Sequence, residues 1–595
     1  MLIQYKKKRL EKVLIGVNAL TAALVTATFV MLFGFYQPLI PAPILYAVQA
    51  ALLFVFISEK IIRAFNAVTI REYLRVFWFE APLLLLLATV VLGAGTWVAP
   101  DASAGTIRHT AIGIYLLLQV LTKLCRTAVN LAASGQNPTT TLIASFLALI
   151  VSGAGLLMLP RASAQENLRF VDALFTATSA TCVTGLIVKD TGADFSFMGQ
   201  VIILTLIQLG GLGIVVFGAV LALLLGQALS LRESAAMQDL LSEQTLGRIS
   251  SMIFFIFVGT LFFEALGAVS LLGMWDDIPT WTGDSGKRWF YSIFHSISAF
   301  CNAGFSLFSN SFVRYNKSWR LYTVVCPLII LGGLGFGVLY DLFSVVVERT
   351  KRFLRIRLDK EARFSIEVRK RMQLQTKIVL TVSASLIILG MLALLLFERY
   401  AKTDPSTEDV GILAALFQSV TARTAGFNTV SIRTMSASSR FVLILLMFVG
   451  GSPGSTAGGI KTVTLAVVVM SVVAALRKRP EVEMFRRSVR LVVVGRALTV
   501  TLLFVAVLFA ATMLLSITES SLGFKMSDIM FEAGSALGTV GLTTGITASL
   551  TTAGKLIIIA VMLIGRLGPL TLLAALTFNL KPVRYAYPDE AIIVG

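Results

Sequence analysis

A short motif that ends in glycine occurs four times in this chain of 595 residues. Each copy begins with phenylalanine, has Ser-Ala or Thr-Ala four residues later, and reaches glycine nine or ten residues after the phenylalanine. The copies are Phe175–Gly185, Phe294–Gly304, Phe417–Gly426 and Phe531–Gly541. Their glycines are 119, 122 and 115 residues apart. A long and nearly fixed period indicates one structural unit used four times.

The segments that lead into the four glycines differ in their side chains. They are Thr181-Cys182-Val183-Thr184-Gly185, Phe300-Cys301-Asn302-Ala303-Gly304, Ala422-Arg423-Thr424-Ala425-Gly426 and Gly538-Thr539-Val540-Gly541. Because only the glycine recurs, we expect the backbone to do the chemistry. Carbonyl oxygens turned toward one axis can replace the hydration shell of a monovalent cation, and glycine permits the conformation this needs. The sequence predicts a filter with K+ at its carbonyls. Four unrelated external loops are the alternative, which the even spacing disfavours.

A second glycine signal follows each motif by 24 to 28 residues. It is Gly-Gly in the first three copies and Gly565-Arg566 in the fourth. Adjacent glycines let helices or the filter approach closely. An arginine in an apolar helix is costly and by default functional. We expect Arg566 to lie below the filter, where its charge raises a barrier to cations. A structural arginine bonded to carbonyls of a broken helix is the alternative, and the two roles are compatible.

The third copy of this signal extends into a loop that cannot be helical, because it holds a proline and five glycines. The predicted gate residues in it are Gly450, Gly451, Ser452, Pro453, Gly454, Ser455, Thr456, Gly458, Gly459 and Lys461. Irregular backbone inside a membrane survives only where it lines protein or a cavity. It is not a phosphate-binding loop, since Ile460 separates Gly459 from the lysine. We predict a mobile flap under the pore, near Arg566.

Arg423 is a cation placed within a predicted cation filter. We expect its side chain to leave the axis and to pair with Glu532, which would thereby support the filter. An unpaired charge at this depth would be costly. The alternative is that Arg423 reaches the external surface.

The composition requires a membrane. The chain is 56% hydrophobic and 14% charged, and its mean hydropathy is +0.84. Its net charge of +19 sits in short loops between apolar runs, which is typical of cytoplasmic loops. Membrane lipid headgroups, and not nucleic acid, are the expected partners of these basic residues. The four cysteines show neither metal-site nor disulfide spacing. We expect no covalently bound cofactor.

These observations predict an all-α polytopic membrane protein. About four transmembrane helices in residues 1–138 precede four repeats, each with an apolar helix, a re-entrant pore segment and a second apolar helix. The repeats are 139–247, 248–372, 373–488 and 489–585, followed by a tail at 586–595. Twelve crossings place both termini in the cytoplasm. Pseudo-four-fold symmetry about the pore follows.

The chain resembles the Trk/Ktr/HKT superfamily of potassium transporters, with closest similarity to the TrkH/KtrB membrane subunits of bacteria. The resemblance covers about 139–585 and is carried by Ser179–Gly185, Thr421–Asn428, Gly538–Thr543, the Ser452–Lys461 loop and Arg566. It implies potassium uptake across the bacterial cytoplasmic (inner) membrane, and a gate in which the loop opposes the arginine. It also implies a homodimer and a cytosolic, nucleotide-binding RCK-type regulatory subunit. Family members with serine at the first filter glycine tend to pass sodium, so Gly185 favours potassium.

Several alternatives stay open at this point. A sodium-permeable or cation-coupled symporter of the same architecture would share these motifs. An intramembrane enzyme is disfavoured, because His109 and His295 are the only histidines and form no recognisable catalytic set. A transporter with inverted repeats is disfavoured, because the four units run in one direction. The N-terminal helices are interpreted as a packing bundle, with a voltage sensor as the weaker alternative.

Overall fold

The computed structural model describes residues 6–71, 73, 80–93, 104–133, 138–165, 168–213, 219, 249–275, 284–358, 371–400, 410–569, 571 and 573. The expected tail at 586–595 and much of the second helix expected in the first repeat lie outside these residues. In the described part the chain is almost entirely helical. Its only strands there are β1 (Val482–Met484) and β2 (Arg487–Val489), an antiparallel hairpin between the third and fourth repeats.

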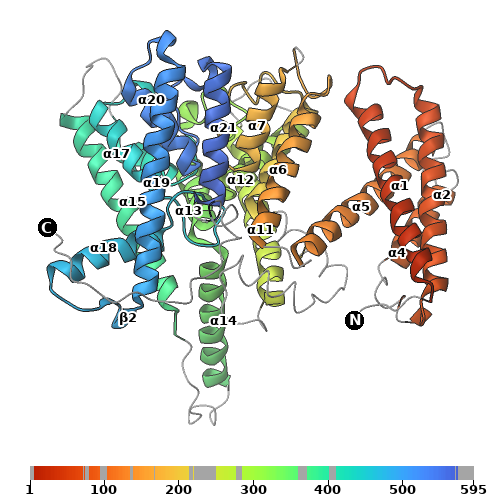
Figure 1. The fold of residues 1–595 in the computed structure, drawn as a ribbon, viewed down its shortest axis with the longest axis horizontal. Helices are drawn as coiled ribbons and strands as arrows, with labels where there is room; N and C mark the ends of the chain where they lie inside the picture. The colour runs from red at the N-terminus through yellow and green to blue at the C-terminus, as the bar shows by residue number, and fades with distance from the viewer. Residues whose placement is uncertain are drawn as a thin grey trace, which may run out of the picture.

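Four helices precede the repeats: α1 (Lys8–Gly34), α2 (Ala42–Asn66), α4 (Glu80–Gly93) and α5 (Ala104–Ala133). They stand beside the main body, and α5 connects them to it (Figure 1). Buried Val25, Leu52, Phe56 and Leu116 form the contact between α1, α2 and α5. The expected N-terminal group of four helices is therefore present.

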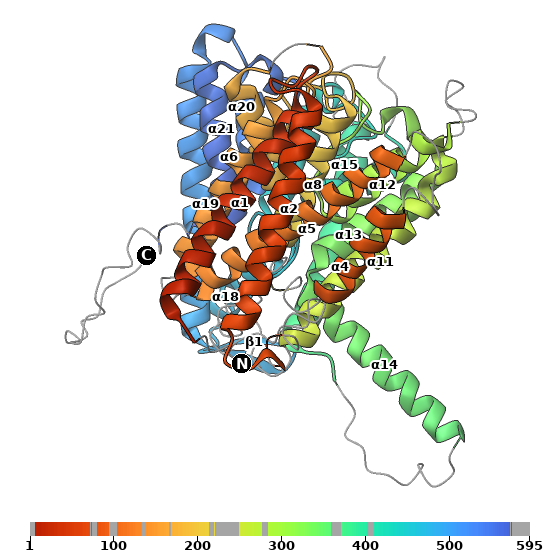
Figure 2. The same ribbon diagram turned by 90° about the vertical axis from the view of Figure 1, so that its right-hand side faces the viewer.

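The repeats follow in order. The first has α6 (Pro138–Leu157), α7 (Phe170–Thr181) and α8 (Phe197–Leu212); the second has α11 (Ile249–Leu271), α12 (Ser285–Phe300), α13 (Cys326–Leu334) and α14 (Phe336–Leu358). The third has α15 (Leu374–Tyr400), α16 (Ile412–Thr421), α17 (Ala437–Phe448) and α18 (Thr462–Leu476); the fourth has α19 (Leu491–Thr518), α20 (Met526–Gly538) and α21 (Thr552–Leu567). Both views show α14 projecting beyond the other helices (Figures 1 and 2).

The helices that carry the motifs, α7, α12, α16 and α20, have 12, 16, 10 and 13 residues. Since crossing a bilayer takes about 20 residues, they are too short to span it. The phenylalanine that opens each motif is 0% exposed: Phe175, Phe294, Phe417 and Phe531. Each belongs to a different apolar cluster of the core. The four short helices are thus each anchored through the same position of the motif.

In the first, second and fourth repeats the second helix ends earlier than the sequence predicts, whereas the break in the third repeat lies at the predicted loop. In the first, second and fourth repeats, Gly213, Gly335 and Gly568 follow the last helical residue with φ of +81°, +88° and +84°. Such a φ lies outside the right-handed helix and is open mainly to glycine. After Gly335 the chain turns by 102° into α14. In the third repeat, residues 449–461 separate α17 from α18.

By length and composition, five described helices could cross a membrane: α1, α2, α11, α15 and α19. Joining the bent pair formed by Leu321–Leu334 and Phe336–Leu354 gives a sixth. The twelve crossings counted from the sequence include shorter apolar helices and stay a prediction.

Three charged side chains of α1 and α2 lie next to one another, one arginine between two carboxylates. Arg63 Nη2 lies 2.8 Å from Glu59 Oε1, and Arg63 Nε lies 3.3 Å from Glu11 Oε1. Because Arg63 is held by two carboxylates, these contacts support a packing role for the helices over a voltage-sensing one. We expect Glu59→Gln to destabilise this bundle by roughly 1–3 kcal/mol, because the ion pair between the buried Glu59 carboxylate and Arg63 is lost. Thermal unfolding in detergent and the voltage dependence of ion flux measure the two roles.

The matched control is Lys12→Gln, which removes an exposed cation of α1. A shift in voltage dependence in Glu59→Gln, without loss of thermal stability, would contradict the packing role.

Candidate ion pathway and gate

The four motif glycines lie around one axis. A methyl group built on Gly185 would lie 2.5 Å from the carbonyl oxygen of Ala303, the residue before Gly304. A methyl group on each of the other three glycines would also lie close to a carbonyl oxygen of the next repeat. The distances are 2.7 Å from Gly304 to Ala425 O, 2.2 Å from Gly426 to Val540 O and 2.2 Å from Gly541 to Thr184 O. The series runs through repeats one, two, three and four and returns to one. The structure thus brings the four filter segments together in a closed ring, with no room for a side chain at any of the four glycines.

The backbone alternates in handedness as it enters the ring. The glycines have φ of +91°, +71°, +79° and +94°, and the residues two positions earlier, Val183, Asn302, Thr424 and Thr539, have φ of +56°, +58°, +83° and +51°. The residue between them has negative φ in each case. In an ordinary extended strand successive carbonyls point to opposite sides. Alternating handedness turns successive carbonyls toward the same side. Each left-handed non-glycine residue costs about 1–2 kcal/mol, so its surroundings must hold it.

The motif serines help to hold the ring. Ser179 Oγ accepts the N–H of Gly185 at 3.1 Å, and Ser535 Oγ accepts the N–H of Gly541 at 3.0 Å. In the second repeat the hydroxyl of Ser298 instead donates to Phe305 O at 2.8 Å. In the sequence alone this serine is only one of the residues that define the motif. Its recurrence at one position was the signal that it bonds to the backbone.

Three of the second glycines lie against the end of a short pore helix. A methyl group on Gly210, Gly332 or Gly565 would lie 2.0, 1.9 or 2.1 Å from the carbonyl oxygens of Thr181, Phe300 and Leu537. Those carbonyls belong to the last turns of α7, α12 and α20. The C-terminal ends of these helices, which carry the negative ends of the helix dipoles, come a few residues before the motif glycines of the ring. Gly450 differs, because its methyl would meet Gly458 O at 1.9 Å within the loop.

The loop at 449–461 is fastened to itself and to the second repeat. Val449 and Ile460 form a parallel bridge, and Gly450 N donates to Ile460 O at 3.0 Å. The loop is bonded to the end of α13 and to the start of α14. Ser452 N donates to Gly333 O (3.0 Å), Thr456 N and Oγ1 donate to Gly332 O (3.4 and 3.1 Å), and Phe336 N donates to Gly454 O (2.9 Å). The loop is ordered by contacts from a repeat other than its own.

The remaining loop residues are buried against the fourth motif segment or bonded within the loop. Ser452 and Thr456 are fully buried, and a methyl group on Gly458 would lie 2.2 Å from Thr539 Oγ1 of the fourth filter segment. Ser455 Oγ donates to Ser452 O at 2.7 Å, and Lys461 Nζ donates to Ala457 O at 2.8 Å. The lysine therefore folds back on the loop.

Arg566 links the loop to the first repeat. Its guanidinium donates to the carbonyl oxygens of Thr456 and Gly210, and to Gly211 O at 3.3 Å. Thr456 belongs to the loop, and the two glycines to the broken end of α8. These bonds to carbonyls are the ones that a structural arginine would make, and the place of the guanidinium between the loop and α8 is also compatible with a gate.

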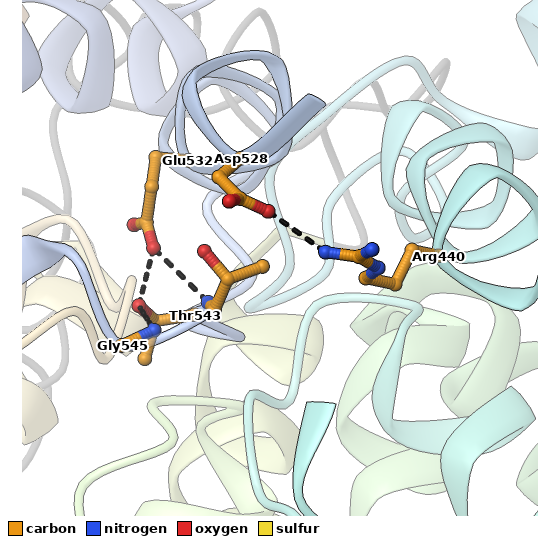
Figure 3. A network of polar contacts seen from close by, with 6 residues as sticks. Arg440, Asp528, Glu532, Thr543 and Gly545 are labelled. Atoms are coloured by element: carbon orange, nitrogen blue, oxygen red, sulfur yellow. Dashed lines mark hydrogen bonds and ion pairs between the residues drawn. The ribbon is translucent and has the colours of Figure 1, made fainter. Parts of the chain in front are cut away.

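The expected pair between Arg423 and Glu532 does not form. Arg423 Nη2 donates to Ser383 Oγ (3.2 Å) and to Gly450 O (3.4 Å), and the residue is 8% exposed, so it does not reach the external surface either. Asp528 bonds to Arg440 at 2.8 Å, while Glu532 turns toward Thr543 on the chain just after the filter (Figure 3). The two charges leave the filter in different directions: Arg423 follows the end of α16 toward the loop, and Glu532 faces its own repeat.

The fold and the ring together define a helical, multi-pass membrane protein built around a central axis. A family model, TrkH, described as a cation transport protein, matches residues 107–581. The chain belongs to this TrkH family of cation transport proteins. The match begins within α5, earlier than the resemblance that starts near residue 139.

The relatives include the Ktr system potassium uptake proteins B of Bacillus subtilis and Vibrio alginolyticus. Each is 38% identical over 465 residues; the alignments cover 77% and 78% of this chain and 97% and 96% of the relatives. The potassium/sodium uptake protein NtpJ of Enterococcus hirae is 36% identical over 466 residues, covering 77% of this chain and 97% of that protein. The crystal structure of the potassium transporter TrkH from Vibrio parahaemolyticus matches with a TM-score of 0.57 and 18% identity, covering 84% of this chain and 98% of that one. The structural likeness supports the fold.

The contact of Gly332 with the pore helix gives a test of this geometry. We expect Gly332→Ala to lower the stability of the folded protein and to distort the filter, because the methyl has backbone, not a movable side chain, at 1.9 Å. Thermal unfolding in detergent measures the first effect, and cation flux the second.

The matched control is Gly155→Ala in α6, where nothing lies within 4 Å of the added methyl. Equal stability of the two variants would mean that the helix does not need glycine there.

Proposed function

We propose that this protein mediates potassium uptake through a filter made of backbone carbonyls, with a gate made by the 449–461 loop and Arg566. The observation that carries the proposal is the closed ring of Gly185, Gly304, Gly426 and Gly541, in which the backbone alternates in handedness. Such a ring offers several carbonyl oxygens from four segments to one ion.

Carbonyl oxygens are neutral, so they suit an ion that must enter by losing water and leave again. The four short helices add the negative ends of their dipoles, which favour a cation at the centre. Within the four filter segments the only charged side chain is Arg423, which is turned away toward Ser383. Selectivity therefore rests on the geometry of the backbone. The names of the relatives, two potassium uptake proteins and one potassium/sodium uptake protein, agree with this substrate class.

The gate rests on charge and on mechanical contact. A guanidinium below a cation filter repels the ion, and its bonds to Thr456 and Gly210 hold the loop against α8. Opening the path requires the Thr456 carbonyl of the loop to separate from the Arg566 guanidinium. The five loop glycines leave the backbone free to move, and the contacts with α13 and Thr539 couple the loop to neighbouring repeats.

Assembly and location belong to the same proposal. We infer a homodimer in the bacterial cytoplasmic membrane, with both termini in the cytoplasm and an RCK-type nucleotide-binding ring as regulatory partner. The exposed basic residues of the hairpin region, Arg479, Arg486, Arg487 and Arg490, are suited to a cytoplasmic face.

The filter is tested at the first glycine. Gly185→Ser adds a side chain 2.5 Å from a carbonyl oxygen at a φ of +91°, so the ring must distort. We expect the preference for potassium over sodium to fall by roughly tenfold, since selectivity depends on carbonyl placement. Rubidium uptake into liposomes, with potassium or sodium as competitor, measures the preference. Gly495→Ser, with open space around it, is the control. An unchanged preference in Gly185→Ser would refute the filter.

The gate is tested at Arg566. We expect Arg566→Ala to raise the resting cation flux several-fold, because a repulsive charge and the bonds to the loop are lost together. Arg566→Lys keeps the charge and should stay closer to the original protein. Arg496→Ala, at an exposed position of α19, controls for loss of an arginine. If flux is unchanged in a variant that keeps its thermal stability, Arg566 is not part of the gate.

A further inference from the structure

We propose that His295 and Glu532 are positioning residues that brace the outer side of the filter in two opposite repeats, while the other two repeats lack this brace. The inference rests on the proposed filter and concerns how its backbone is held. Both residues directly follow the phenylalanine that opens their motif, and the matching residues of the first and third repeats are Thr176 and Gln418. All four are at most 1% exposed.

In the fourth repeat the brace is a carboxylate. Glu532 Oε1 accepts the N–H of Thr544 at 3.1 Å and the hydroxyl of Thr543, and Oε2 accepts the hydroxyl of Thr547 at 2.9 Å. Thr543 Oγ1 also accepts the N–H of Gly545 at 2.9 Å (Figure 3). The chain that leaves Gly541 is thus wrapped around one carboxylate of its own pore helix. The neighbouring Asp528 is engaged by Arg440 and takes no part.

In the second repeat an imidazole makes the same contacts. His295 Nε2 accepts the N–H of Leu307 at 3.3 Å and lies 3.2 Å from Ser306 Oγ. A backbone N–H only donates, so Nε2 carries no proton and Nδ1 donates to Tyr291 O at 2.8 Å. This fixes a neutral imidazole whose acceptor faces the filter chain.

The two sets of contacts fall at equal distances from the filter glycine. Ser306 and Leu307 are two and three residues after Gly304, and Thr543 and Thr544 are two and three residues after Gly541. In each case the earlier residue contributes a hydroxyl and the later one a backbone N–H. A carboxylate and an imidazole, which share little chemistry beyond an acceptor, therefore do one task in two repeats.

The other two repeats do not make these contacts. The hydroxyl of Thr176 donates to Asp172 O at 2.9 Å, within its own helix. Gln418 is fully buried, and neither its oxygen nor its nitrogen has a hydrogen-bond partner among the described residues. The hydroxyl of Thr429, three residues after Gly426, likewise has no partner within the described part of the chain. Around the ring the braced repeats alternate with the unbraced ones, so the braces lie across the axis from each other.

The brace acts on strained backbone. Two residues before the glycine, Asn302 and Thr539 are left-handed although they are not glycine. The pore helix holds the inner side of each segment through Ala303 N to Ser298 O and Val540 N to Ser535 O, both at 2.8 Å. The brace holds the outer side, so the segment is fixed at both ends and its carbonyls stay aligned.

The test removes the acceptor in each repeat. His295→Leu and Glu532→Leu are reconstituted in liposomes, and rubidium uptake is measured against potassium and sodium. We expect the potassium preference to fall by about tenfold in each, the size expected for losing one strong bond. Gln418→Leu, the same substitution at the unbraced position, should leave the preference unchanged. His295→Gln and Glu532→Gln leave an oxygen acceptor in place, so these variants should retain most of the potassium preference.

Selectivity separates positioning from a merely structural role. A preference that stays intact in both leucine variants, with only the total flux lowered, would overturn the brace, as would an equal loss in Gln418→Leu. If a leucine variant does not fold, Ser306→Ala and Thr543→Val remove the hydroxyl from the loop side and must lower the preference. The filter is judged separately: if Gly185→Ser lowers the preference and the brace variants do not, the brace alone is wrong.

Discussion

The structure depends on one constraint: four stretches of backbone approach one axis so closely that no side chain fits between them. Each filter glycine lies against the carbonyl before the next glycine, and the series closes on itself. The other features serve this approach. Short helices deliver the segments, a buried phenylalanine anchors each helix, and a second glycine admits the helix end at Gly210, Gly332 and Gly565. In the proposed filter, charged side chains could not take the place of the backbone carbonyls, because a filter that conducts must bind its ion weakly enough to release it.

The sequence predicts this arrangement because the constraint acts on residue type. Where only glycine fits, glycine recurs, and its period reveals the repeats. The breaks in the second helices are harder to predict, since glycine is common within transmembrane helices. Gly335 ends the helix where an added methyl group would lie 2.7 Å from Pro453 O of the third repeat, and no local sequence pattern reveals a contact with another repeat. The loop at 449–461 was predictable, because proline and five glycines exclude a helix whatever surrounds them.

The partners of charged residues were the part that the sequence could not supply. Arg423 and Glu532 are the opposite charges nearest to two filter segments, which made their pairing plausible. Partner choice depends on the direction in which each side chain leaves the backbone. Arg423 lies between Ala422, at the helix end, and left-handed Thr424, and it is directed to Ser383 and the loop. Glu532 lies within α20 and faces the chain that leaves the ring. The hydrogen bonds given for both side chains go to neutral groups, Ser383 and Gly450 for Arg423 and three threonines for Glu532, so no ion pair joins them beside the ring.

The departures from four-fold symmetry depend on one another. In the first and second repeats the second glycine of the pair faces a filter side chain: Gly211 lies against Cys301, and Gly333 against Asn302. The fourth repeat has Arg566 at this position, and an arginine needs both space and acceptors. The third repeat provides an acceptor, because its second helix is opened into a loop that presents the carbonyl of Thr456. Without the loop, the arginine would keep only the acceptors of α8; without the arginine, the loop would lose its hydrogen-bonded link to α8. The four-fold pattern is thus kept at the ring of glycines and lost at the proposed gate, where Arg566 meets the loop.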